Sequence, residues 1–251
     1  HAEVAAVRLA IAIGYRLIDS AEMYGDGGAE EVVGAAIADA LRAGDCQREE
    51  LTIVSKVLPS NASARGVVAA CERSRQRLGL DTIDLYLLHW PGSHPLRETM
   101  QGFEQLRAQG AIAHWGVSNF DLAAMKKLVA LPGGERCAAN QVYYSLGERG
   151  IDFDLKPWQQ QRALPLMAYC PIDQSALAGD TRADEIGEQI AAADHGRGQS
   201  RPQAGRKRTV SGTTTFFSPR TAQSRPPPVR RNTRPRPANN PASARPIWSV
   251  L

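Results

Sequence analysis

Helical stretches and short apolar runs alternate along residues 1–193. The apolar runs are nearly continuous, as expected for strands of a parallel sheet that are buried on both faces. Strands are predicted at 15–21, 51–57, 83–90, 113–119, 138–145 and 165–171, and helices at 1–13, 29–42, 64–78, 96–109, 121–131, 153–163 and 181–193. Six strand–helix alternations with short connections indicate a parallel α/β sheet, and at 251 residues they favour a barrel over an open sheet.

Polar side chains stand at the end of each predicted strand. They are Asp19, Lys56, His89, Ser118 with Asn119, Gln141 and Tyr169, and Tyr24 follows the first strand on a short polar loop. The carboxyl ends of successive parallel strands lie on one face of a barrel, so these side chains can converge on one site. Taken singly, each residue has a structural explanation, such as a capping Asp or a core His. Six such positions in succession favour a functional site.

The glycine-rich stretch at 25–28 does not indicate a dinucleotide-binding Rossmann fold, because it lacks the spacing of that fingerprint. The four cysteines, Cys46, Cys71, Cys137 and Cys170, have neither paired nor metal-ligand spacing, so we expect reduced thiols and no metal site. The sequence contains no apolar run of 18 residues and no signal-peptide pattern, and we expect a cytoplasmic protein without membrane attachment.

Residues 195–251 differ in composition from the rest of the chain. They contain twelve Arg and Lys, no Asp or Glu, and nine of the sixteen Pro, and only 209–217 has strand-like content. Such a segment buries too little apolar surface to offset the entropy of ordering, which predicts disorder. Binding of nucleic acid or another polyanion is an alternative, but no aromatic residues are interleaved with the arginines. A reading-frame shift in the coding DNA between about codons 180 and 195 is a third hypothesis.

The motifs around the strand ends resemble those of the aldo-keto reductase family, whose members are (β/α)8 TIM barrels that use NADPH or NADH. The resemblance covers residues 1–194. The stretches that carry it are 14–21 with Tyr24, Val-Ser-Lys at 54–56, Leu-Leu-His-Trp at 87–90, Gly-Val-Ser-Asn-Phe at 116–120, Asn-Gln-Val at 140–142 and Ala-Tyr-Cys-Pro at 168–171. Ala-Glu-Met-Tyr at 21–24 and Leu-Pro-Gly-Gly at 131–134 are most similar to bacterial members that reduce methylglyoxal and other small aldehydes.

The resemblance implies a role for each residue at the strand ends. Tyr24 would be the general acid, and the cation of Lys56, paired with Asp19, would lower the pKa of its hydroxyl. His89 would orient the substrate carbonyl. The nicotinamide would be bound by Ser118, Asn119 and Gln141 and stacked on Tyr169.

The sequence departs from the family at three places. Cys170 stands where a Ser commonly follows the tyrosine, and neither the family's first strand nor its eighth strand and helix is recognisable. In the family, the Arg and Asn that bind the 2′-phosphate of NADPH belong to that eighth unit. We therefore expect an incomplete barrel over 1–194 whose open edges expose unpaired backbone groups, followed by a tail at 195–251 that is disordered or out of frame.

The resulting functional prediction is an NAD(P)H-dependent oxidoreductase that reduces small aldehydes or ketones, with no nucleic-acid partner. The alternative is an inactive partial barrel that at most binds nucleotide, or whose basic tail binds polyanions.

Overall fold

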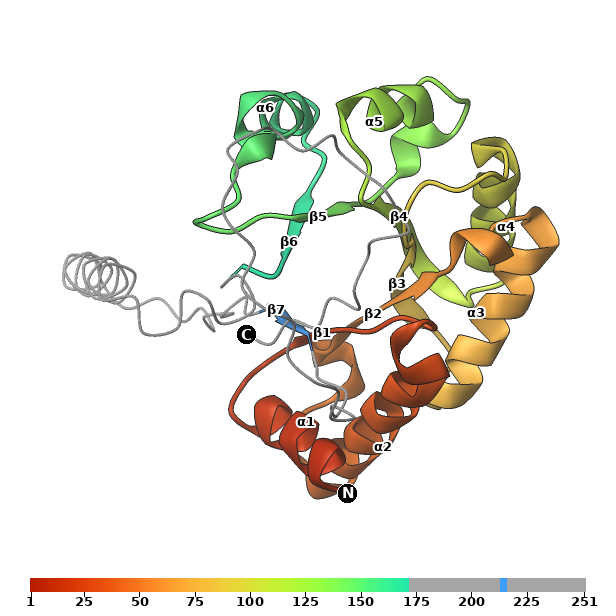
Figure 1. Cartoon of the computed structure of the whole chain (residues 1–251). Coiled ribbons are helices and arrows are strands. Elements are labelled where there is room, and N and C mark those ends of the chain that lie inside the picture. Colours follow the sequence, from red (N-terminus) through yellow and green to blue (C-terminus); the bar gives the residue numbers. More distant parts are fainter. Residues whose placement is uncertain (172–212, 216–251) are drawn as a thin grey trace, which may run out of the picture.

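The computed structural model describes residues 1–171 and 213–215, which form one curved parallel sheet with helices along its outer side (Figure 1). The sheet order is β6-β5-β4-β3-β2-β1-β7, and every pairing is parallel. Its strands are β1 (Leu17–Asp19), β2 (Thr52–Val57), β3 (Ile83–Leu88), β4 (Ile112–Ser118), β5 (Asn140–Tyr143), β6 (Leu166–Tyr169) and β7 (Thr213–Thr215).

Six α-helices connect and cover the strands. They are α1 (Ala2–Ala12), α2 (Gly28–Ala43), α3 (Ala64–Leu78), α4 (Leu96–Ala108), α5 (Leu122–Val129) and α6 (Leu155–Gln160). Short 3₁₀ turns are η1 (Tyr24–Gly27), η2 (Arg48–Glu50), η3 (Pro59–Asn61), η4 (Gly134–Arg136) and η5 (Gly150–Phe153). Two of these helices have well-defined ends. The Asp121 carboxylate caps α5 by accepting from Ala124 N, and Gly79 ends α3 with a left-handed φ of 64°.

The predicted α/β fold is confirmed as an open, curved sheet that resembles half of a barrel. Within the described ranges β6 and β7 are its end strands, and β7 pairs with the edge of β1 that faces away from β2. β7 falls inside the stretch 209–217 that the sequence marked by strand-like content. The helix predicted at 181–193 and the remainder of the 195–251 tail lie outside the described residues.

Two apolar layers lie on the two faces of the sheet. The large layer packs against the helices, and in it Phe103 stacks on Trp115 with ring centroids 5.5 Å apart and meets the ring of Tyr86 edge-on at 6.0 Å. The small layer lies on the inner, concave face and consists of Leu17, Val54, Leu85, Leu87, Ala138, Ala139 and Met167. On β2 the two sets alternate, with Ile53 and Val57 in the large layer and Val54 in the small one, because successive side chains of a strand point to opposite faces.

Candidate active site

The predicted site residues stand directly above the inner apolar layer. Side chains two positions apart on a strand share a face, and five members of the layer each precede a predicted site residue by two positions. These pairs are Leu17 and Asp19, Val54 and Lys56, Leu87 and His89, Ala139 and Gln141, and Met167 and Tyr169. The strand periodicity therefore brings polar side chains from five strands to the same end of the concave face.

Lys56 and Asp19 form a buried ion pair at the ends of β2 and β1. Lys56 Nζ lies 2.7 Å from Asp19 Oδ1 and also donates to the carbonyl of Ser20 at 2.8 Å. Burial lowers the pKa of Lys56, but the Asp19 carboxylate and Tyr24 raise it by more, so the pKa is raised and the ammonium stays charged. A buried cation in this position requires such a partner, because an unpaired buried charge is costly.

Tyr24 begins the turn η1, in the loop that follows β1. Its hydroxyl accepts a hydrogen bond from Lys56 Nζ at 3.5 Å, and Nζ lies 5.0 Å from the centroid of its ring. The backbone of the turn is unusual, since Gly25, Asp26 and Gly27 all have φ between 53° and 95°. Two glycines in this stretch make the left-handed conformations accessible, and they allow the chain to turn sharply from Tyr24 into α2.

The loop that contains Tyr24 is hydrogen-bonded to the end of β2 and to the residues after it through Glu22. Glu22 Oε1 accepts from the backbone N–H of Leu58 at 2.7 Å and from Asn61 Nδ2 at 3.0 Å, and its own backbone N–H donates to Lys56 O at 3.3 Å. These bonds set the position of Tyr24 relative to Lys56. Sequence reasoning gave Glu22 no role of its own, and the available signal was the presence of a second carboxylate between Asp19 and Tyr24.

The hydroxyl of Tyr24 is a weaker acid in the folded protein than in water. Burial, the largest cause, raises the pKa of Tyr24, while the Lys56 charge lowers it and the Asp19 charge raises it. The effect of Lys56 expected from the sequence is present, but burial outweighs it and the net shift is upward. Tyr24 is therefore a neutral phenol near pH 7.

His89 follows β3 and faces Tyr24 across the site. The two rings meet edge to face, with centroids 5.6 Å apart and an interplanar angle of 78°. Burial and, next, the Lys56 charge lower the pKa of His89 to about 2, so the imidazole is neutral at ordinary pH. Its Nδ1 is buried and has no hydrogen-bond partner among the described residues.

Asn119 joins three strand ends. Its Nδ2 donates to His89 O at 3.0 Å and to Ser118 Oγ at 3.1 Å, and its Oδ1 accepts from the hydroxyl of Tyr169 at 2.7 Å. The residue adopts a φ of 59°, a left-handed conformation that Asn tolerates better than most residues. The Tyr169 ring stacks on that of Tyr143 at 5.5 Å. Tyr143 was missed in the sequence, although it lies two positions beyond Gln141 on the same face.

Gln141 completes the connected cluster. Its Nε2 donates to Asp19 Oδ2 at 3.0 Å, and its backbone carbonyl accepts from Asn119 N at 2.8 Å. All eight residues named from the sequence thus lie at one end of the sheet, joined by hydrogen bonds or by ring contacts. Cys170 lies beside them, fully buried with a φ of 51°.

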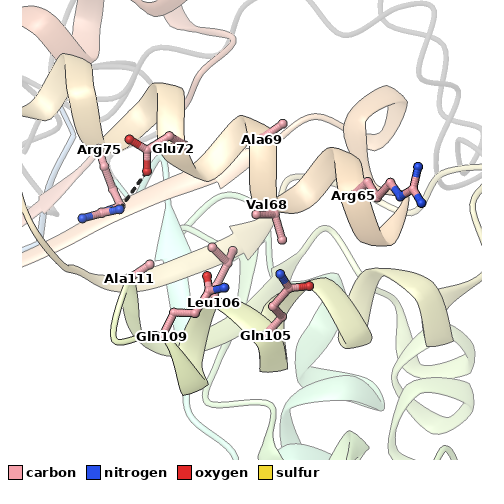
Figure 2. Close-up of a pocket in the computed structure, with 9 residues that line it drawn as sticks. All are labelled: Arg65, Val68, Ala69, Glu72, Arg75, Gln105, Leu106, Gln109 and Ala111. Atoms are coloured by element: carbon pink, nitrogen blue, oxygen red, sulfur yellow. Dashed lines mark hydrogen bonds and ion pairs between the residues drawn. The ribbon is translucent and has the colours of Figure 1, made fainter.

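A groove of about 420 Å³ lies elsewhere, on the outer face between α3 and α4 (Figure 2). Val68, Leu106 and Ala111 give it an apolar floor, and an ion pair of Glu72 with Arg75 lies along its edge. None of its lining residues belongs to the strand-end cluster. Among the described residues, no group of three or more potential metal ligands occurs, and none of the helices combines the length and apolar content needed to cross a bilayer.

Fold and site together define a half-barrel α/β protein with a buried Asp–Lys–Tyr–His cluster at the carboxyl ends of its parallel strands. The family model for the aldo/keto reductase family matches residues 2–208, and the chain belongs to that family.

Relatives of this chain include reductases of small dicarbonyl compounds. The chain is 53% identical over 173 residues to the methylglyoxal reductase YeaE of Escherichia coli, a match that covers 69% of this chain and 58% of that protein. It is 35% identical over 184 residues to the glyoxal reductase of Bacillus subtilis, covering 73% of this chain and 63% of that protein. The chain thus spans less than two thirds of the length of these relatives.

Solved structures show the same likeness. An aldo-keto reductase from Klebsiella pneumoniae in complex with NADPH matches with a TM-score of 0.65 at 51% identity, covering 69% of this chain and 58% of that one. A second aldo/keto reductase from the same organism, in complex with NADP and acetate, matches with a TM-score of 0.67 at 47% identity. This match covers 76% of this chain and 66% of that one.

Proposed function

We propose that this protein is a nicotinamide-dependent reductase of small aldehydes or ketones in which Tyr24 is the general acid. The observation that carries the proposal is the position of the Tyr24 hydroxyl, 3.5 Å from the Nζ of a lysine that is itself paired with a buried carboxylate. Reduction of a carbonyl develops negative charge on its oxygen, and a donor held at that oxygen lowers the barrier.

Tyr24 would deliver its proton to the carbonyl oxygen of the substrate. As the phenol loses its proton, the Lys56 cation beside it stabilises the phenolate. Asp19 keeps Lys56 charged and holds it in place. The phenolate then regains a proton before the next cycle.

His89 would orient the substrate. A neutral imidazole has one N–H donor, and such a donor can bind the carbonyl oxygen without competing with Tyr24 for the proton. The lowered pKa of His89 supports this role, because the ring remains neutral at physiological pH.

The residues around Asn119 fit the nicotinamide end of the cofactor. Its carboxamide needs both donors and acceptors, and Ser118, Asn119 and Gln141 supply hydroxyl and amide groups beside the aromatic ring of Tyr169. When bound, the reduced nicotinamide supplies the hydride. We propose NADPH as the cofactor, with NADH as the alternative, since the related structures contain NADPH or NADP.

Methylglyoxal is the proposed test substrate, because the relatives from Escherichia coli and Bacillus subtilis are named for methylglyoxal and glyoxal. We also propose that the protein works in the cytoplasm, in keeping with its four buried free cysteines. The rival proposal is a partial barrel that binds nucleotide without turnover. The open edge at β6 in the described sheet favours that rival.

Oxidation of NADPH and of NADH with methylglyoxal tests the proposal. We expect turnover by the unmodified chain and a loss of about 10²-fold or more in kcat for Tyr24→Phe, with cofactor binding retained. Tyr144→Phe is the matched control, because the Tyr144 hydroxyl is bound to Asp152 of η5 and Lys156 of α6, neither of which is a predicted site residue. Cofactor binding without turnover in the unmodified chain would establish the rival instead.

A further inference from the structure

We propose that Gln141 is a positioning residue that holds the Asp19 carboxylate from across the concave face of the sheet and thereby fixes Lys56 relative to Tyr24. The hydrogen bond from Gln141 Nε2 to Asp19 Oδ2 measures 3.0 Å and joins residues 122 positions apart. β5 and β1 are not neighbours, because β4, β3 and β2 stand between them. The bond therefore crosses the concave face of the sheet.

Each oxygen of the Asp19 carboxylate has its own donor. Oδ1 accepts from Lys56 Nζ and Oδ2 accepts from Gln141 Nε2. A carboxylate is only an acceptor, which fixes the orientation of the Gln141 amide with its nitrogen toward Asp19. Both side chains are almost fully buried, so water cannot replace the amide if it is lost, and Oδ2 would be left without a donor.

The second donor matters because a carboxylate rotates easily. The terminal torsion of Asp is broad, and a single bond to Lys56 leaves the plane of the carboxylate poorly fixed. The Gln141 bond fixes that plane and with it the direction of the bond to Nζ. Lys56 Nζ divides its donors among Asp19, Ser20 and Tyr24, so a change at Asp19 alters its approach to the Tyr24 hydroxyl.

Gln141 is itself held by backbone pairing on both sides. It pairs in register with Ser118 of β4 and with Met167 of β6, and its carbonyl accepts from Asn119 N. Its Cα therefore cannot shift without breaking two strand pairings, which makes it a rigid anchor for Asp19. The catalytic consequence of this anchoring rests on the function proposed above, whereas the coupling of Gln141 to Asp19 does not.

The test replaces the donor by a group that donates only at low pH. In Gln141→Glu the introduced carboxyl faces the Asp19 carboxylate in a buried position, and both features raise its pKa above the unfolded value. A raised pKa in the folded state gives stability that is present below the unfolded pKa and is lost as the pH rises through the folded pKa. The urea midpoint of this variant, measured without cofactor, should approach that of the wild type near pH 5 and fall behind it by pH 8.

Two controls isolate the contact with Asp19. The extra pH dependence should shrink or vanish when Gln141→Glu is combined with Asp19→Asn, because the facing charge is removed. Gln105→Glu makes the same substitution at an exposed position of α4 and should add no pH dependence. Equal pH dependence of Gln141→Glu with and without Asp19→Asn would overturn the coupling. Gln141→Leu removes the donor at every pH and should lower the urea midpoint throughout.

Activity measurements then test the positioning role. We expect kcat of Gln141→Glu, relative to wild type at the same pH, to fall about tenfold between pH 5 and pH 8, the equivalent of one lost buried hydrogen bond. A residue that only bound cofactor would raise KM for the cofactor and leave the pH profile of kcat unchanged, and that result would overturn the positioning role. An inactive wild type would refute the proposed function. The unfolding measurements would still test the coupling of Gln141 to Asp19, because they do not depend on activity.

Discussion

Lys56 Nζ lies 2.7 Å from Asp19 Oδ1, and the two side chains are only 0% and 1% exposed. A buried pair of this kind is costly to break on one side, because the remaining charge has no partner and no water. We expect Lys56→Met to lower the free energy of unfolding by about 3–5 kcal/mol. The double variant Lys56→Met with Asp19→Leu should recover part of that loss, and urea titration of the three proteins measures it.

The surface pair of Arg8 with Asp45 is the matched control for this prediction. Its two atoms lie 3.0 Å apart, but the side chains are 44% and 21% exposed, and such pairs contribute at most about 1 kcal/mol. Arg8→Met should therefore change the free energy of unfolding far less than Lys56→Met. Equal losses of unfolding free energy in the two variants would show that burial does not make the Lys56–Asp19 pair more costly to break than a surface pair.

The raised pKa of Tyr24 predicts the alkaline limit of activity. A general acid works only while it holds its proton, so kcat should stay level from neutral pH to about pH 9 and fall only above the ordinary tyrosine value of about 10. Steady-state rates from pH 6 to 10.5, with circular dichroism to confirm folding, measure this limit. A descending inflection below pH 9 would mean that Lys56 outweighs burial.

Burial of His89 predicts a loss of stability in acid. The folded pKa of about 2 lies below the unfolded value of about 6.5, so the unfolded chain binds the extra proton in between. The stability due to the neutral imidazole is complete above pH 6.5 and is lost as the pH falls, at up to about 1.4 kcal/mol per pH unit. In His89→Gln the slope of unfolding free energy between about pH 6 and pH 4 should be smaller by that amount. His114→Gln, at an exposed position on β4, is the control, and equal slopes in the two variants would refute the prediction.

The strands and most of the site could be predicted from the sequence because both depend on local pattern. Each buried apolar run ends in a polar residue, so finding the run also finds the residue. Lys56 and His89 illustrate this, since each stands two positions beyond an apolar residue of the inner layer. Because successive side chains of a strand point to opposite faces, the position of a residue along the strand then determines which face it occupies, without knowledge of the tertiary structure.

Other features depend on contacts that no local pattern specifies. The hydrogen bond of Gln141 to Asp19 forms only because the whole sheet is curved. The direction in which the pKa of Tyr24 shifts depends on how deeply the side chain is buried, which the sequence does not show. The start of α6 also differs from the prediction of a helix at 153–163. Residues 150–153 form the turn η5, and the Asp154 carboxylate accepts from Leu155 N, so that the helix begins at Leu155.

Helix packing on the outer side gives a last prediction. A Cβ added at Gly34 of α2 would lie 2.6 Å from the backbone oxygen of Leu78 and 2.7 Å from that of Arg77. Because neither oxygen belongs to a flexible side chain, α2 must move away from α3, and we expect Gly34→Ala to cost about 1–3 kcal/mol of unfolding free energy. Gly28 begins the same helix with no atom within 4 Å of an added Cβ, and Gly28→Ala should be neutral or stabilising by up to about 1 kcal/mol. Thermal or urea unfolding of the two variants side by side decides the matter, and a Gly34→Ala variant as stable as Gly28→Ala would show that the two helices are not in contact at this position.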